Sequence, residues 1–190
     1  MLINNEEEIG VSAIFASKKY DQGDIIAQSS TKIQYPIKIS QAIELIILNY
    51  IELVLEIFEN IIKGNKIIAH KQDEKLATYS LWRDENDYRI NWNQSSTAIL
   101  NFINAVSNPY KGAYTFINGF QKIRILEAEL EKDVCIENRS VGKIIYVRDQ
   151  HPVIVCKTGL IKLLKIIDDK TKENLLPFKK FRIRLTDYEK

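Results

Sequence analysis

The stretch GVSAIFASKKYDQGD, from Gly10 to Asp24, decides how the first part of the chain folds. Residues 11–15 form a short apolar run that is typical of a strand, and residues 25–33 predict a second strand. The residues between the two runs include aspartate and glycine, which favour turns. The pattern therefore predicts two short strands joined by a turn.

A long apolar helix is predicted after these strands. Ser40 suits its N-cap, the helix would extend from about Gln41 to Lys63, and Gly64 would end it. The polar residues of this helix recur every three to five positions and predict one narrow polar stripe. They are Gln41, Glu44, Asn49, Glu52, Glu56, Glu59 and Lys63. Two strands cannot cover the remaining apolar surface, so we expect the isolated chain to expose a large apolar patch and to associate with itself or with another polypeptide.

Composition excludes several other classes. Residues 42–62 contain four glutamates, which would be costly in a bilayer, so the apolar segment does not predict a membrane span. The net charge of +2 is too small to imply nucleic-acid or membrane binding. Cys135 and Cys156 lie far apart among apolar residues, which predicts buried free thiols in a reducing cytoplasm. Because the chain has no Cys-x-x-Cys or Cys/His cluster, we expect no metal site.

The second half of the chain predicts a linker, a short helix and a β-rich domain. Residues 67–87 are polar and irregular, and a helix is expected over 95–106. Asn118-Gly119 is a strong hairpin signal between two of the strands that follow. Strands are predicted at residues 113–117, 122–130, 142–147, 153–157, 160–167 and 181–185. So many short strands favour a small OB-like β-barrel.

Three blocks resemble the folate-dependent formyltransferases, and the second of them, residues 77–119, contains two separate motifs. Gly10–Asp24 is similar to the end of the family's catalytic domain, which reads roughly G-V-T, seven or eight variable residues, then D-x-G-D-I. ATYSLWRDENDYRINW, over residues 77–92, resembles the family's A-T-Y linker and I-D-W element, with Asn91 in place of the usual Asp. NPYKGA, over 108–113, resembles the turn that opens the C-terminal domain. LLPFKKFR, over 175–182, resembles the sugar-modifying branch.

The resemblance implies an α/β remnant of a Rossmann-like formyltransferase domain followed by a small OB-like β-barrel. Residues 1–72 would be the C-terminal part of the catalytic domain, 73–90 the linker, and 91–190 a helix with the barrel. The family's Asn-x-His pair and the S-L-L-P loop after it are absent from this chain. We therefore expect no formyltransferase activity from this polypeptide alone.

The resemblance also implies a donor and an acceptor. The donor is 10-formyltetrahydrofolate, and the sugar branch formylates the amine of a nucleotide-linked amino sugar. The modest basicity favours this branch over methionyl-tRNA formyltransferases, because a tRNA partner usually demands a strongly positive surface. The alternatives are a methionyl-tRNA formyltransferase fragment and a non-catalytic binding or oligomerisation module. A missing N-terminal half or self-association through the apolar helix would supply the partner surface.

The resemblance assigns Asp21 as the catalytic aspartate, which would orient the family's histidine and favour its charged form. The alternative is a turn carboxylate that accepts hydrogen bonds from local amides. Trp82 and Arg83 are candidates for stacking on the base and pairing with the diphosphate of the nucleotide-sugar. They could instead clamp the linker and form a surface ion pair. Tyr110 and Lys111 are similar candidates, with surface positions as the alternative.

Overall fold

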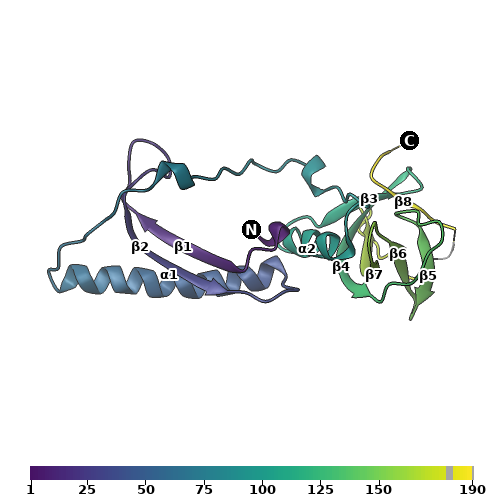
Figure 1. Cartoon of the computed structure of the whole chain (residues 1–190), viewed down its shortest axis with the longest axis horizontal. Coiled ribbons are helices and arrows are strands. Elements are labelled where there is room, and N and C mark those ends of the chain that lie inside the picture. The colour runs from purple at the N-terminus through teal and green to yellow at the C-terminus, as the bar shows by residue number, and fades with distance from the viewer. Residues whose placement is uncertain (179–181, 190) are drawn as a thin grey trace. The chain divides into compact units, whose positions relative to one another are not determined.

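The computed structural model describes residues 1–178 and 182–189. The chain divides into two compact units. The N-terminal unit contains residues 6–34 and 41–82, and the C-terminal unit contains Met1–Asn5, Tyr35–Ser40 and Arg83–Lys190. The elements of both units are labelled in Figure 1.

The N-terminal unit begins with two strands that lie side by side, β1 (Glu8–Ile14) and β2 (Ile25–Lys32) (Figure 1). They pair antiparallel, as expected of strands joined by a short turn. Ile9 and Val11 alternate with exposed neighbours and are buried on one face. The predicted pair of strands is therefore confirmed. Among the described residues this unit has no other strands, so the parallel sheet of a Rossmann-like domain is not seen in it.

Helix α1 (Ile39–Ile62) lies along the two strands (Figure 1). Its inner face carries Ala42, Asn49 and Leu53, which share one side of the helix because they are spaced by seven and four residues. The Thr31 hydroxyl donates a hydrogen bond to Asn49 Oδ1 over 2.8 Å. Asn49 is only 4% exposed, so its assignment to the exposed polar stripe is wrong.

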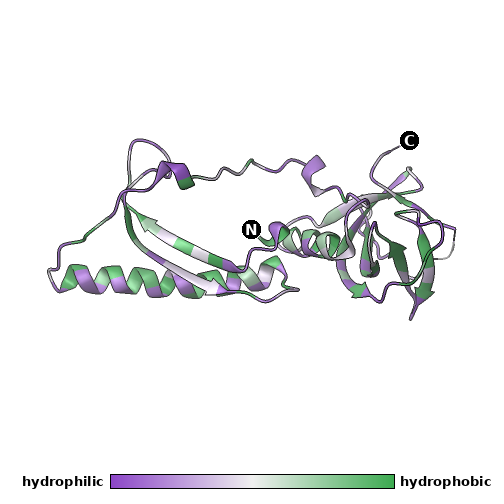
Figure 2. Cartoon of the chain, in the orientation of Figure 1, coloured by the Kyte–Doolittle hydropathy of each residue, from purple (hydrophilic) through white to green (hydrophobic). Residues whose placement is uncertain are grey.

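The outer face of α1 is apolar and open to solvent. Figure 2 shows hydrophobic residues recurring along the whole helix. The exposed apolar side chains are Ile47, Leu48, Tyr50, Ile51, Val54, Leu55, Phe58, Ile61 and Ile62. Their exposed fractions lie between 49% and 69%. The prediction of a large exposed apolar patch is confirmed, and these nine residues are called the α1 outer face below.

In the C-terminal unit a short helix packs on a curled antiparallel sheet. Helix α2 (Ser96–Ala105) is capped by the Ser95 side chain, which accepts a hydrogen bond from Ala98 N over 3.1 Å. Within the described residues the sheet has the strand order β5-β6-β7-β4-β3-β8. Its strands are β3 (Ala113–Ile117), β4 (Gln121–Glu131), β5 (Ile144–Arg148), β6 (His151–Val155), β7 (Leu160–Asp168) and β8 (Leu185–Thr186).

Hydrogen bonds join the two ends of this sheet. Leu185 N donates to Gly142 O over 2.7 Å, and Ile144 N donates to Ile183 O over 3.3 Å. Gly142 has φ +78°, and a Cβ there would lie 2.1 Å from the Leu185 carbonyl oxygen, so the junction requires glycine. The curled sheet agrees with the predicted barrel-like domain, while its OB-like character stays a prediction. Lys179, Lys180 and Phe181 lie outside the described residues.

The core of this unit holds the aromatic residues near the start of the sheet. Trp92 is buried, and its Nε1 donates to Thr115 Oγ1 over 3.0 Å. Tyr114 and Phe116 are also buried, with an edge-to-face contact between ring centroids 5.8 Å apart. Nucleic-acid stacking on these two rings is therefore not available in this fold.

The two cysteines differ in environment. Both are free thiols, but Cys135 is exposed in the irregular segment after β4, so the prediction that it is buried is wrong. Cys156 is buried, and burial raises the pKa of its thiol to about 12. In the part of the chain that the structure describes, no helix has both the length and the apolarity to cross a membrane.

Candidate functional site

Asp21 lies in the turn between β1 and β2 and adopts a left-handed backbone conformation with φ 56°. Asp tolerates this region better than most residues with a side chain. Its side chain is exposed. Among the described residues no hydrogen bond to the Asp21 carboxylate is found, so the alternative of a carboxylate tied to local amides has no support in this structure.

Gly23 allows the turn to close tightly. A Cβ at Gly23 would lie 1.6 Å from the carbonyl oxygen of Phe15, which no side chain can tolerate. The amide of Phe15 donates to Asp24 O over 3.0 Å and closes the hairpin at the same level. The close packing of this turn therefore requires the glycine of the D-x-G-D pattern.

The segment that follows α1 holds this turn in place through hydrogen bonds from His70 and Gln72. His70 and Ile25 exchange two backbone hydrogen bonds of 2.7 and 2.9 Å. The Gln72 side-chain amide donates to the carbonyl oxygens of Asp21 and Gly23 over 2.8 and 2.7 Å. The backbone that carries Asp21 is thus held from both sides, while its carboxylate is left accessible.

A second candidate lies wholly within the C-terminal unit. It is a groove with a volume of about 870 Å³, called the basic groove below. Its walls come from the start of α1, the segment before η3 (Asn86–Tyr88), the loop after α2, and strands β4 and β7 with the turn that follows. Both Tyr110 and Lys111 line it. The other lining residues are Lys38, Ser40, Glu85, Ser107, Asn108, Lys122, Arg124, Leu126, Glu127, Lys165, Ile167, Asp169 and Lys172.

Arg124 forms the floor of the basic groove. Its side chain is only 5% exposed, and all of its nitrogens have partners. Nε donates to Asp169 Oδ1 over 2.5 Å, Nη1 donates to Gly112 O over 2.9 Å, and Nη2 donates to Glu85. Lys122 Nζ bonds the same Glu85 carboxylate over 2.7 Å and lies 4.0 Å from the centroid of the Tyr114 ring.

These contacts keep the two carboxylates ionised. Burial acts to raise the pKa of Glu85, but hydrogen bonds from Lys122 and Arg124 outweigh it and hold the pKa below its ordinary value. The balance at Asp169 is the same, with burial opposed by the hydrogen bond from Arg124, and its pKa is also lowered. Arg124 thereby fixes a residue of the predicted linker, Glu85, to the sheet.

The groove as a whole is positively charged. Six cationic side chains line it against three carboxylates, Glu85, Glu127 and Asp169, which leaves an excess of three positive charges. Arg124 and Lys122 are committed to Glu85 and Asp169. The lysines at the rim are more exposed, with long contacts such as 3.4 Å for Lys111–Glu85. An arrangement of this kind favours anions of small size.

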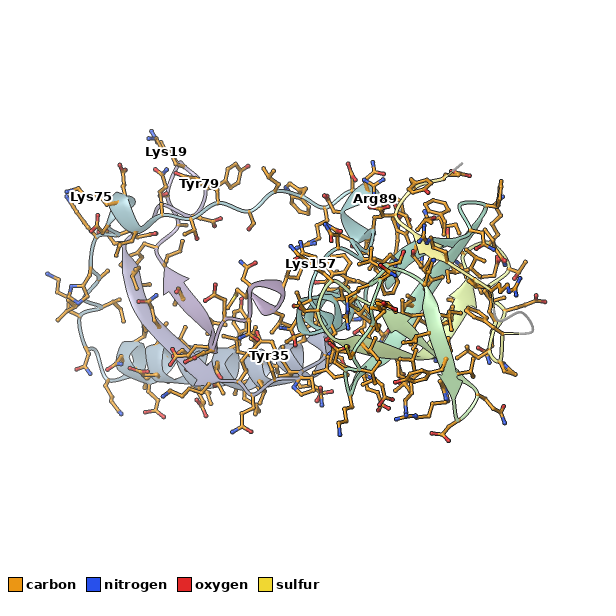
Figure 3. All side chains as sticks on the ribbon, turned by 45° about the vertical axis from the view of Figure 1, so that its right-hand side comes forward. Lys19, Tyr35, Lys75, Tyr79, Arg89 and Lys157 are labelled. Carbon is orange, nitrogen blue, oxygen red and sulfur yellow. The ribbon has the colours of Figure 1, made fainter. Side chains whose placement is uncertain are left out.

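Trp82 and Arg83 do not line the basic groove. Trp82 is fully exposed, so it does not clamp the linker onto either unit. Its neighbours Tyr79 and Leu81 are each 92% exposed, and Figure 3 shows the Tyr79 side chain projecting from the linker ribbon. The roles predicted for Trp82 and Arg83 stay predictions.

Most residues of the basic groove could not be recognised from the sequence. Lys122 and Arg124 alternate along β4 and therefore point to the same face, which strand periodicity could have indicated. Their partners Glu85 and Asp169 are distant in sequence. No local pattern marks those residues, because only the fold brings them to Arg124.

Comparison with known families gives a match to the formyl transferase C-terminal domain over residues 83–180, just over half of the chain. The methionyl-tRNA formyltransferase of Lactococcus lactis subsp. lactis (strain IL1403) is 29% identical over 163 residues, covering 86% of this chain and 50% of that protein. The chain spans about half the length of the curated relatives it matches.

Solved structures share the fold. The crystal structure of HypX from Aquifex aeolicus in complex with tetrahydrofolic acid matches with a TM-score of 0.66 and 22% identity, covering 91% of this chain and 29% of that one. The N-formyltransferase from Helicobacter canadensis, in complex with folinic acid and dTDP-3-aminofucose, matches with a TM-score of 0.64 and 19% identity, covering 85% of this chain and 57% of that one. At these identities the likeness concerns the fold alone.

Proposed function

Because the chain belongs to the formyl transferase C-terminal domain family, we propose that it is the C-terminal part of a formyltransferase. The formyl donor is 10-formyltetrahydrofolate, and the acceptor is the amine of a nucleotide-linked amino sugar. The match over residues 83–180 carries this proposal. The HypX and H. canadensis structures, whose ligands are tetrahydrofolic acid and folinic acid, support a folate donor.

The chemistry needs a carboxylate of the kind that Asp21 supplies. The acceptor amine attacks the formyl carbon and loses a proton, while the formyl oxygen becomes an oxyanion. A histidine that moves the proton works best when a carboxylate orients it and favours its charged form. Asp21 suits that role because its backbone is braced by Gln72 and its side chain is exposed and unpartnered among the described residues.

The catalytic histidine and asparagine must then come from a catalytic half that this sequence does not contain. The α1 outer face supports this division, since nine exposed apolar side chains on one helix need a covering surface. The proposed occupant of that face is the catalytic half, and self-association is the alternative when that half is absent. The expectation of no turnover by the isolated chain follows from the same division.

A methionyl-tRNA acceptor is the second candidate, because relatives named methionyl-tRNA formyltransferase match the sequence over most of its length. The H. canadensis structure, with its dTDP-3-aminofucose, favours the sugar acceptor instead. Both acceptors carry phosphate and present a primary amine, so the same transfer chemistry serves either. Only an assay with both acceptors separates them.

The test is a chimera in which this chain replaces the matching half of the L. lactis formyltransferase. We expect formyl transfer from 10-formyltetrahydrofolate to a dTDP-linked amino sugar, with a loss of about a hundredfold or more in Asp21→Asn. Asp24→Asn, three residues away in the same turn, is the matched control and should retain most activity. A chimera whose turnover is equal in the wild type and Asp21→Asn would contradict the role of Asp21. Transfer to methionyl-tRNA alone would favour the second acceptor.

A further inference from the structure

The basic groove holds more positive charge than its own carboxylates neutralise. The strongest contacts of Glu85 and Asp169 are with Arg124 and Lys122, and Glu127 lies 3.6 Å from Lys38. Lys165 lies on the exposed side of β7 opposite Glu127 of β4, and within the described residues it forms no ion pair with a carboxylate. Glu85 also pairs with Lys111 over 3.4 Å, and Asp169 with Lys172 over 3.5 Å. Three carboxylates thus face six cations, and the excess of three positive charges around a partly enclosed space favours one small anion.

The shape of the groove narrows the choice of anion. A volume of about 870 Å³ falls in the range of pockets that hold molecules of nucleotide size. Tyr110 lies at the wall and is 50% exposed, so one part of its ring is free to stack on a planar group. Lys111, its neighbour, reaches the same space.

We propose that the basic groove binds a nucleoside diphosphate, with the phosphates among Lys111, Lys165 and Lys172 and the base against Tyr110. The choice of a diphosphate rests on the proposed function, in which the acceptor is a nucleotide-linked sugar. The charge excess and the aromatic wall come from the structure alone. Glu85 and Asp169 serve a different purpose, since they hold Arg124 and keep the floor of the groove rigid.

A small anion is favoured over RNA by two observations. The groove carries an excess of three positive charges, while the chain as a whole carries only +2. A nucleic-acid interface requires many phosphate contacts along an extended basic surface. Tighter binding of RNA than of the nucleoside diphosphate would therefore overturn the proposal.

The test is a calorimetric titration of the purified 190-residue chain, without folate or formyl donor, with dTDP, thymidine, inorganic pyrophosphate and a short single-stranded RNA. We expect saturable binding of dTDP below about 1 mM that weakens as salt is raised. Lys165→Glu and Lys111→Glu should each weaken it by about tenfold or more. Lys66→Glu, an exposed lysine outside the groove, is the matched control and should bind as the wild type does.

Each outcome separates this proposal from the enzymatic one. Weaker binding of thymidine and pyrophosphate than of dTDP supports joint recognition of base and phosphates. No saturable dTDP binding, equal binding by Lys165→Glu and Lys66→Glu, or tighter binding of RNA than of dTDP would overturn the proposal. The titration measures binding and not formyl transfer. Its result therefore does not depend on whether the chimera is active.

Discussion

At the scale of single residues, the ion pairs of Arg124 make the C-terminal unit sensitive to acid. Because the pKa values of Glu85 and Asp169 are lowered in the folded protein, both carboxylates stabilise it at pH values above their ordinary pKa values of 4.5 and 3.8. That stabilisation is lost as the pH falls through the lower folded values. We expect thermal melts to show a fall in stability below about pH 4.5.

Removing one of these carboxylates should reduce the acid sensitivity. Glu85→Gln keeps a hydrogen-bonding side chain but loses its charge, so its melting temperature should change less between pH 6 and pH 3 than that of the wild type. The difference in stability at neutral pH should be modest, about 1 kcal/mol, since Glu85 is partly exposed to solvent. Glu137→Gln, outside the groove, is the control. Identical pH profiles for Glu85→Gln and wild type would contradict the role given to this ion pair.

Gly23 is the residue on which the Asp21 turn depends most. The Cβ of Gly23→Ala would meet the Phe15 carbonyl oxygen at 1.6 Å, and backbone atoms cannot move aside as a flexible side chain would. We expect a loss of about 2 kcal/mol or more in the free energy of unfolding, measured by urea titration with circular dichroism. Gln22→Ala, the exposed neighbour, should change it by less than about 0.5 kcal/mol. Equal midpoints for the two variants would show that the turn relaxes freely.

At the scale of elements, periodicity predicted most of the secondary structure. The helix expected over residues 41–63 is α1 at Ile39–Ile62, and the hairpin around Asn118-Gly119 is β3 and β4. These predictions succeeded because they depend on local turn chemistry and repeating apolar positions. The orientation of α1 was not predictable in the same way, since most of its surface is apolar and the pattern does not say which side meets the strands.

Neither the basic groove nor the hydrogen bonds from Gln72 to the Asp21 turn could be predicted from the sequence. Arg124 meets Glu85 and Asp169 across 39 and 45 residues of chain, and Gln72 meets Asp21 across 51. Tyr110 and Lys111 were found because a family resemblance drew attention to their turn. Contacts between residues so far apart in the sequence depend on how the strands and the linker pack, and no short motif encodes that packing.

Asn49 offers a direct test of how α1 lies on the strands. Its Nδ2 is buried and has no hydrogen-bond partner in the described part of the chain, which is costly for an amide. Asn49→Leu should therefore raise the free energy of unfolding by about 1 kcal/mol, because Thr31 is only partly buried and can turn to water. Glu52→Leu, on the exposed side, should leave stability nearly unchanged. A loss of stability in Asn49→Leu would mean that the amide has a partner in solution.

At the scale of the whole molecule, the two units differ in how completely they bury their apolar residues. The C-terminal unit buries α2 and the curled sheet against each other in its main hydrophobic core. Among the described residues the N-terminal unit has two strands, α1 and the short 3-10 helix η2 (Glu74–Leu76), and it leaves the α1 outer face open. This contrast, together with the half-length match to curated relatives, supports a unit that is completed by another polypeptide surface.

Sedimentation equilibrium of the purified chain over a wide range of concentrations tests most directly whether another polypeptide surface must cover the α1 outer face. If the α1 outer face must be covered, the apparent mass should rise above the 22.1 kDa of one chain as concentration increases. Addition of a formyltransferase catalytic half should then convert the associated species into a one-to-one complex. A single species of 22.1 kDa at every concentration, with or without that half, would contradict the account.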